Sequence, residues 1–205
     1  MGPETSRNRL PDQQPTDEAL VAQAARGDEG AFLALYERYR EHVYRFAYRL
    51  LGSSALAEDV THDCFLGLLR RPDAFDPARA SLRTYLYAAA RNLALKQFRR
   101  PRVEVTLAEL RAEPHANAAQ QPLRQLLAAE LSEAVRRAVD GLPLLQREAL
   151  VLFEYEELSL AEIASVVGAD VGAVKARLAR ARENLRRALA PYLANDAGAR
   201  ELEQR

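Results

Sequence analysis

The sequence predicts an all-α fold of two small helical domains joined by a flexible linker. Apolar residues recur at three- and four-residue intervals over most of the chain, which is typical of amphipathic helices. Strand-like alternation is nowhere longer than 102–107, and a stretch rich in Pro, Asn and Gln separates two periodic halves. We expect a disordered tail at 1–16, a first domain at 17–102, a linker at 103–122, a second domain at 123–193 and a C-terminal tail at 194–205.

The first domain shows three helical stretches. An apolar stripe begins near Asp17 and continues to Gly52, a plausible helix end because glycine accepts a left-handed backbone at low cost. A second helix is predicted from about Leu56 to Arg71, and a third over about 81–100. Each of these two stops before a proline, which cannot continue the hydrogen-bond pattern of a helix.

Composition excludes several classes of protein. The 205 residues carry 29 basic and 29 acidic side chains and a single cysteine, so no intramolecular disulfide is possible. No apolar run approaches the roughly 20 residues that span a bilayer, and the N-terminus has no secretory signal, so we expect a cytoplasmic protein without membrane insertion.

Catalytic and cofactor signals are missing from the sequence. There is no glycine-rich phosphate loop, no nucleophile motif and no distinguished carboxylate pair, so we expect neither an enzyme nor a cofactor. His62 and Cys64 alone are too few ligands for zinc. Cys64 lies on an apolar stripe, where a small buried hydrophobe is expected; a redox switch would need an exposed thiol.

Positive charge is concentrated between Arg79 and Arg102. This segment holds seven basic side chains and no acid, interleaved with Tyr85, Tyr87 and Phe98. Basic groups neutralise phosphates and aromatic rings stack on unpaired bases, so the pattern indicates a nucleic-acid contact. A merely solvated basic helix is the alternative, although solvated charge runs usually mix signs.

The helix that precedes this basic segment has the opposite charge bias. Segment 52–76 carries five acids and two arginines, and its stripe of Leu56, Val60, Cys64 and Leu68 is joined by apolar residues on other sides. A helix that is apolar on more than one side buries more than one face. One face can serve the core and another a partner protein, or the helix can simply be central.

The second domain repeats this sorting of charge. Segment 148–162 holds five glutamates and no base, while 175–187 holds six basic residues against one glutamate. Two basic segments in two helical domains suggest two contacts with one long polyanion.

A helix-turn-helix is predicted between the acidic and basic segments. Ser159 and Glu162 have the spacing of a capping box, Gly168 suits the turn and Asp170 caps the second helix. Such a motif places its second helix in the major groove, or less commonly mediates protein contacts only. The outward face of that helix is small and apolar, so we expect phosphate contacts to dominate and hydrogen-bonded base discrimination to be weak.

The order of these motifs resembles the extracytoplasmic-function (ECF) group of bacterial RNA polymerase sigma factors. Segment 32–52 resembles the start of conserved region 2, 57–66 its polymerase-binding helix, and 75–95 its promoter-melting part. Segments 141–148 and 158–187 resemble region 4. The chain departs from the family's usual tryptophan at Tyr85 and has alanines in the recognition helix.

The resemblance implies a role for each group of residues. The −10 element would be bound by Phe75, Arg79, Arg83, Tyr85, Arg91, Asn92, Lys96, Arg99 and Arg100. The −35 element would be bound by Gly172, Ala173, Lys175, Ala176, Arg177, Ala179, Arg180 and Arg182. Core polymerase would be bound through Glu58, Asp59, His62, Asp63 and Leu66.

The implied partners are the clamp and flap of core RNA polymerase, promoter DNA and an anti-sigma factor. A sigma factor of this kind directs promoter-specific initiation. The alternatives are a stand-alone helix-turn-helix regulator, which would not need the basic aromatic segment, and a decoy that occupies polymerase or anti-sigma without initiating.

Overall fold

The computed structural model describes residues 15–99 and 122–202, and its side chains are described over 15–98 and 129–192. Within these ranges every regular element is helical, which confirms the all-α prediction. Most of the N-terminal tail, the alternating stretch at 102–107 and the predicted linker up to residue 121 lie outside the described residues, while Pro122 is already the first residue of a helix. The elements are α1 (Asp17–Ala24), α2 (Glu29–Leu51), α3 (Ser54–Arg70), η1 (Pro72–Ala74), α4 (Leu82–Arg99), α5 (Pro122–Asp140), α6 (Leu144–Leu150), η3 (Val151–Tyr155), α7 (Leu160–Val167) and α8 (Val171–Leu202).

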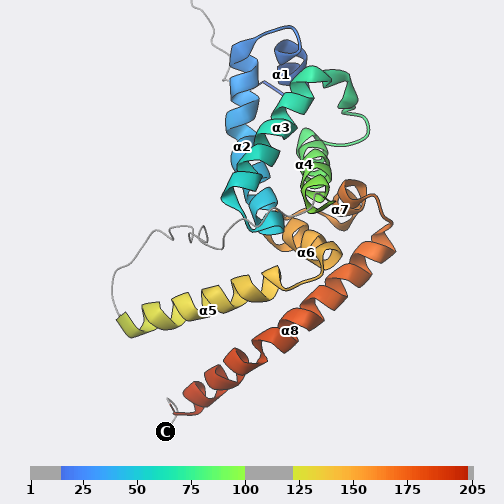
Figure 1. Cartoon of the computed structure of the whole chain (residues 1–205). Helices are drawn as coiled ribbons and strands as arrows, with labels where there is room; N and C mark the ends of the chain where they lie inside the picture. The colour runs from blue at the N-terminus through green and yellow to red at the C-terminus, as the bar shows by residue number, and fades with distance from the viewer. Residues whose placement is uncertain (1–14, 100–121, 203–205) are drawn as a thin grey trace, which may run out of the picture.

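The N-terminal half is a bundle of α1 to α4 (Figure 1). Its stripe does not form one continuous helix from Asp17, because Gly27 takes a left-handed φ of 92° and Asp28 caps a new helix by accepting a 3.0 Å hydrogen bond from the Ala31 amide. The predicted end at Gly52 is confirmed, since this residue closes α2 with a φ of 68°.

Helix α3 is central in the bundle. Val60, Cys64 and Leu68 are buried as the stripe predicted, and Phe65 on a neighbouring side is buried as well. The Phe65 ring meets the Tyr36 ring of α2 edge-on, with centroids 5.0 Å apart. α3 therefore buries two faces inside its own domain, in agreement with the alternative that it is a central core helix. Its acidic side stays exposed.

The helix-turn-helix forms as predicted. The Ser159 hydroxyl accepts from the Glu162 amide, and the Glu162 carboxylate accepts from the Ser159 amide at 2.9 Å. Gly168 turns the chain with a φ of 63°, and the Asp170 carboxylate accepts from the Ala173 amide at 2.8 Å to begin α8. Local capping chemistry thus begins and ends α7 and begins α8.

The two halves pack against each other. Helix α7 lies on α4, α6 contacts α2, and one apolar cluster contains buried residues from both halves, such as Leu86 and Ile163. Helices α5 and α8 extend away from this contact (Figure 1). The sequence predicted two helical domains but gave no sign that they would dock.

Candidate nucleic-acid interface

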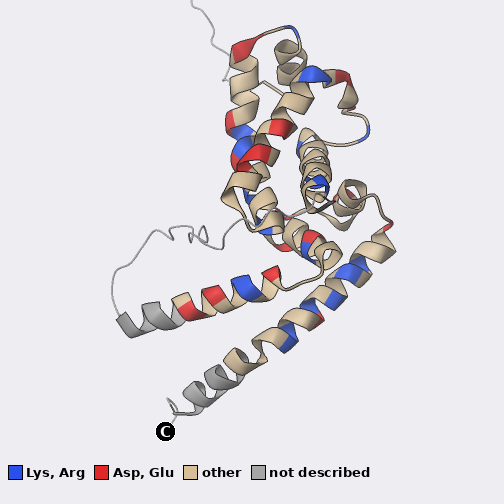
Figure 2. Ribbon diagram, in the orientation of Figure 1, with Lys and Arg blue, Asp and Glu red and all other residues tan. Residues whose placement is uncertain are grey.

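Helix α8 presents its predicted recognition face to solvent. Lys175, Ala176, Ala179 and Arg180 are exposed, as is Gly172, and Ala173 is half-exposed. Val174, Leu178 and Ala181 turn inward to the core. Positions of Lys and Arg recur along α8 in Figure 2.

Two of the arginines predicted for this face contact other residues of their own domain. Arg177 pairs with Glu148 at 3.2 Å, and Arg182 pairs with Glu154 at 2.8 Å while its guanidinium lies over the Phe153 ring. Arg177 is only 20% exposed. Lys175 and Arg180 are therefore the better candidates for direct phosphate contacts.

The predicted residues of α4 and the preceding loop lie in three environments. Arg79, Asn92 and Lys96 are exposed, whereas Arg83, Tyr85 and Arg91 are half-buried. Phe75 is buried, and its ring packs on that of Tyr85 with centroids 5.7 Å apart. The buried Phe75 ring thus packs against the Tyr85 ring and helps to fix its position. The side chains of Arg99 and Arg100 lie outside the described residues.

Tyr85 and Tyr87 differ although both belong to the basic segment. Tyr85 is only half-buried, and this partial burial raises its pKa. Tyr87 is 1% exposed, and its hydroxyl donates to the Glu156 carboxylate. Burial first, and the Glu156 contact second, raise the pKa of Tyr87. The expectation that Tyr87 offers a face for base stacking is wrong for this arrangement, because its ring is enclosed.

The arginines of α4 contact glutamates of the second half. Arg91 donates to both carboxylate oxygens of Glu148, from Nε at 2.7 Å and from Nη2 at 3.1 Å. Arg83 donates to the Glu156 carbonyl. Glu148 and Glu156 belong to the acidic segment 148–162 of the sequence, but both side chains are buried. The only sequence signal was that segment 148–162 contains no Lys or Arg, which indicates that the cationic partners of these glutamates lie in other segments.

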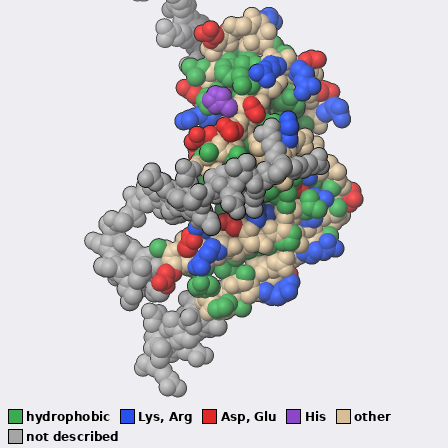
Figure 3. Space-filling model, in the orientation of Figure 1, with side chains coloured by type: hydrophobic (Ala, Val, Ile, Leu, Met, Phe, Trp, Pro, Cys, Tyr) green, Lys and Arg blue, Asp and Glu red, His purple; other side chains and the backbone are tan. Residues whose placement is uncertain are grey.

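The predicted polymerase-binding residues share one side of α3. Glu58, Asp59, His62 and Asp63 are exposed, and Leu66 is half-buried. Acidic side chains gather over α2 and α3 on the face shown in Figure 3. The acidic side of α3 is therefore exposed among the residues that the structure describes.

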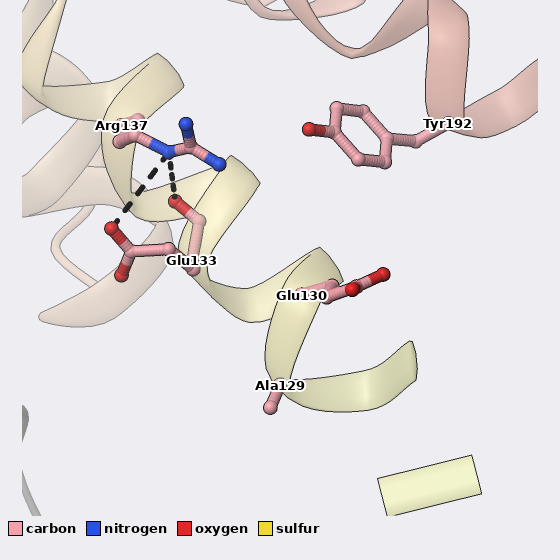
Figure 4. Close-up of a pocket in the computed structure, with 5 residues that line it drawn as sticks. All are labelled: Ala129, Glu130, Glu133, Arg137 and Tyr192. Atoms are coloured by element: carbon pink, nitrogen blue, oxygen red, sulfur yellow. Dashed lines mark hydrogen bonds and ion pairs between the residues drawn. The ribbon is translucent and has the colours of Figure 1, made fainter. Parts of the chain in front are cut away.

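No enclosed ligand site accompanies these surfaces in the part of the chain with described side chains. A hollow between α5 and α8 is lined by Ala129, Glu130, Glu133, Arg137 and Tyr192, and it is open to solvent (Figure 4). Across the same side chains, no three His, Cys, Asp or Glu residues gather as a metal site. None of the described helices combines the length and apolarity needed to cross a membrane.

Cys64 is enclosed, as its position on the stripe predicted. It is 2% exposed, and its thiol contacts the Leu86 carbonyl at 3.5 Å. Burial raises its pKa to about 12. A thiol that stays protonated and covered is a poor nucleophile.

Two family profiles match the chain. Sigma-70 region 2 matches residues 35–103, and Sigma-70 region 4 matches residues 132–185. The ECF RNA polymerase sigma factor SigW of Bacillus subtilis is 32% identical over 177 residues, which cover 82% of this chain and 94% of SigW. The ECF RNA polymerase sigma-E factor of Escherichia coli K12 is 31% identical and covers 88% of this chain and 98% of its own length.

Solved structures agree on the fold. The structure of CnrH in complex with the cytosolic domain of CnrY has a TM-score of 0.63 at 28% identity, covering 85% of this chain and 97% of CnrH. The sigma factor RpoE of Bartonella quintana, solved with the anti-sigma factor NepR, has a TM-score of 0.62 at 21% identity and covers 78% of this chain and 96% of its own. At that identity RpoE is informative about the fold alone.

Proposed function

Because the chain belongs to the ECF group of RNA polymerase sigma factors, we propose that it binds core RNA polymerase and directs transcription from specific promoters. The observation that carries the proposal is that both conserved regions match in order, with a free recognition face on α8. In this role residues 17–102 act as region 2 and residues 123–193 as region 4. The chain contributes specificity and no catalysis of its own, and it acts in the cytoplasm.

Helix α3 is the proposed contact with the polymerase clamp. Its exposed acids Glu58, Asp59 and Asp63, with His62 and the half-buried Leu66, combine charge with a small apolar contact. Such a mixture is typical of interfaces in which polar groups surround an apolar centre. Region 4 would contact the polymerase flap.

Helix α4 and the loop before it are the proposed site for the −10 element. Exposed Arg79, Asn92 and Lys96 would supply phosphate and base contacts, and the half-buried Tyr85 would supply an aromatic ring. A flipped base costs a few kcal/mol of stacking, which polar contacts and stacking in this loop would offset. Arg83 and Arg91 can contribute only after they leave the glutamates of region 4.

Helix α8 is the proposed reader of the −35 duplex. Lys175 and Arg180 would contact phosphates on either side of the exposed alanines Ala176 and Ala179. Alanine methyls can touch thymine methyls but form no hydrogen bond with base edges. We therefore expect single-base changes in this element to cost less than about 3 kcal/mol each. Larger losses at several positions, measured by binding to duplex variants, would contradict this reading.

An anti-sigma factor is the proposed regulatory partner. The related CnrH was solved in complex with the cytosolic domain of CnrY, and it shares 28% identity with this chain. Co-purification of the full chain from its own cells, followed by identification of the bound protein, would test this expectation.

Transcription in vitro with purified core polymerase tests the function. Initiation at a defined start site, which core alone does not give, is the expected result. A matched pair of variants sharpens the test: Asp63→Asn on the proposed clamp face should weaken core binding, whereas Glu37→Gln on the exposed side of α2 should not. Duplex binding without any effect of core would indicate a stand-alone regulator, and core binding without initiation would indicate a decoy.

A further inference from the structure

Glu148 of α6 is an acidic side chain that is fully buried. Its carboxylate accepts from Arg91 of α4, through Nε at 2.7 Å and Nη2 at 3.1 Å, and from Nη1 of Arg177 on α8 at 3.2 Å. Oxygen Oε1 is shared between the two arginines. A buried carboxylate without a partner is strongly unfavourable, so Glu148 depends on these contacts.

The two partners of Glu148 belong to different halves of the chain. Arg91 comes from region 2, and it must leave Glu148 before it can bind DNA in the proposed function. Arg177 comes from region 4, as Glu148 does, and α6 and α8 are joined a second time where the Asn184 amide donates to Gln146 at 2.7 Å. The pair of Glu148 and Arg177 is therefore the one that region 4 keeps when Arg91 binds elsewhere.

The pair with Glu148 leaves much of the Arg177 guanidinium without an acceptor. A guanidinium carries N–H groups on each of its nitrogens, and Arg177 uses only Nη1 for Glu148. Within the part of the chain whose side chains are described, Nε and Nη2 of Arg177 have no acceptor, and the buried nitrogen without a partner is Nε of Arg147. The free nitrogens of Arg177 therefore reach solvent, although its side chain is only 20% exposed.

Arg177 lies at the edge of the recognition face of α8. Residues three positions apart are neighbours on a helix, so Arg177 lies beside exposed Arg180 on one side and beside buried Val174 on the other. When such a helix lies in the major groove, its flanks meet the phosphates while its centre meets the base edges. The free N–H groups of Arg177 are thus placed where a phosphate would lie.

We propose that Glu148 is a positioning residue for duplex binding: it fixes the Arg177 guanidinium at the edge of the recognition face, so that the free N–H groups bind a DNA phosphate. The inference rests on the proposed function of α8. Exposed Lys175 and Arg180 lose rotamer freedom when they bind DNA, whereas Arg177 has already lost it in the folded chain. An acid behind a basic residue then strengthens binding to a polyanion, which is the opposite of what net charge alone predicts.

This difference in sign gives the test, which is binding of a mixed-sequence duplex by the full chain at low salt. Glu148→Gln removes a negative charge, which by charge alone should strengthen binding. We expect it instead to weaken binding about threefold to tenfold, because DNA must then order the Arg177 side chain. Glu154→Gln is the matched control: it removes an acid from an exposed pair with Arg182, and it should leave binding unchanged or strengthen it.

Double variants show whether Glu148 acts through Arg177. In an Arg177→Gln background, Glu148→Gln should no longer weaken binding. In an Arg91→Gln background, it should weaken binding by the same factor as in the starting chain, because the effect belongs to region 4 alone. The proposal is overturned by a loss that persists without Arg177, by a loss that disappears without Arg91, or by tighter binding of the Glu148→Gln chain.

Arg177→Lys keeps both Glu148 and the positive charge, and it tests the proposal even where circular dichroism shows that Glu148→Gln is unfolded. A lysine ammonium pairs with a carboxylate as a point charge and lacks the fixed fork of a guanidinium. We therefore expect this variant to bind about threefold to tenfold more weakly. Unchanged binding, or no duplex binding by the starting chain at low salt, would overturn the proposal.

Transcription with core polymerase separates this proposal from the proposed function. If core initiates with the chain but Glu148→Gln does not weaken duplex binding, the positioning role is wrong and the sigma function stands. If the variants bind as expected but core never initiates, the sigma function is wrong and the positioning role stands.

Discussion

Helices α4 and α8 are both rich in arginine, yet they differ in what surrounds that charge. The exposed side of α8 offers Lys175 and Arg180 to solvent, and the glutamates that pair with it belong to its own domain. On α4, Arg91 is enclosed by a glutamate from the other domain. The same local charge is therefore an accessible binding surface in one region and an intramolecular contact in another.

The largest expected effect comes from removing the carboxylate that both helices share. Glu148→Ala should lower the free energy of unfolding by about 3 kcal/mol, because it leaves Arg91 and Arg177 without their buried partner. Urea denaturation measures the change. Glu183→Ala, which breaks exposed pairs with Arg186 and Arg187, should cost less than about 1 kcal/mol. Equal losses in the two variants would erase the distinction between the buried and exposed contacts.

Helix α7 lies between the two basic helices, so its cap is the next place to test the comparison. Ser159→Ala should cost about 1 kcal/mol of stability by removing the capping box. The hydrogen bonds from Ser159 lower the pKa of Glu162 below its ordinary value of 4.5. This contribution is therefore complete above pH 4.5 and is lost as the pH falls through the lowered pKa of the folded chain. Denaturation at neutral and acidic pH should show the gap between wild type and variant narrowing in acid; a constant gap would argue against the carboxylate's part in the cap.

Salt dependence separates phosphate contacts on α8 from internal ones. Arg180→Ala should weaken duplex binding by a similar factor on every sequence and reduce the slope of log affinity against log salt by about 1. Arg182→Ala should change the slope less, because its guanidinium is already paired with Glu154. Titrations at several salt concentrations measure both slopes. Identical slopes for the two variants would mean that the internal pair opens on DNA.

The smallest effect is expected at Cys64. With a pKa of about 12 and a covered thiol, it should resist alkylation at pH 8 in the folded chain and react fully once denatured. Mass spectrometry of intact protein gives the modified fraction. Rapid alkylation of the native chain would show that the first domain opens around α3, and it would reopen the possibility of a redox role.

Local chemistry was predictable from the sequence, and long-range pairing was not. Gly52, Gly168 and the capping box act within a few residues, so their types and spacing predict helix ends directly. The break at Gly27 and Asp28 carried the same kind of signal, but the apolar stripe on either side obscured it.

The docking of the two domains joins residues far apart in the chain. Arg91 and Glu148 are separated by 57 positions, and neither periodicity nor charge runs indicate such a pair. Tyr85 and Tyr87 look equivalent in the sequence, yet they point to different sides of α4 and only Tyr87 meets Glu156. The exposure of the acidic side of α3 and of Lys175 and Arg180 on α8 could be predicted, because exposure of an outward helix face follows from the pattern of that helix alone.

The most direct test of the account places a photocrosslinker on each basic helix of the polymerase-bound chain at a promoter. Asn92 on α4 and Ala176 on α8 are both exposed and can carry the probe. We expect the Asn92 probe to crosslink to the unpaired non-template strand of the −10 element, and the Ala176 probe to crosslink to duplex DNA upstream. Crosslinks from both probes to the same DNA segment, or from the Asn92 probe to protein alone, would contradict it.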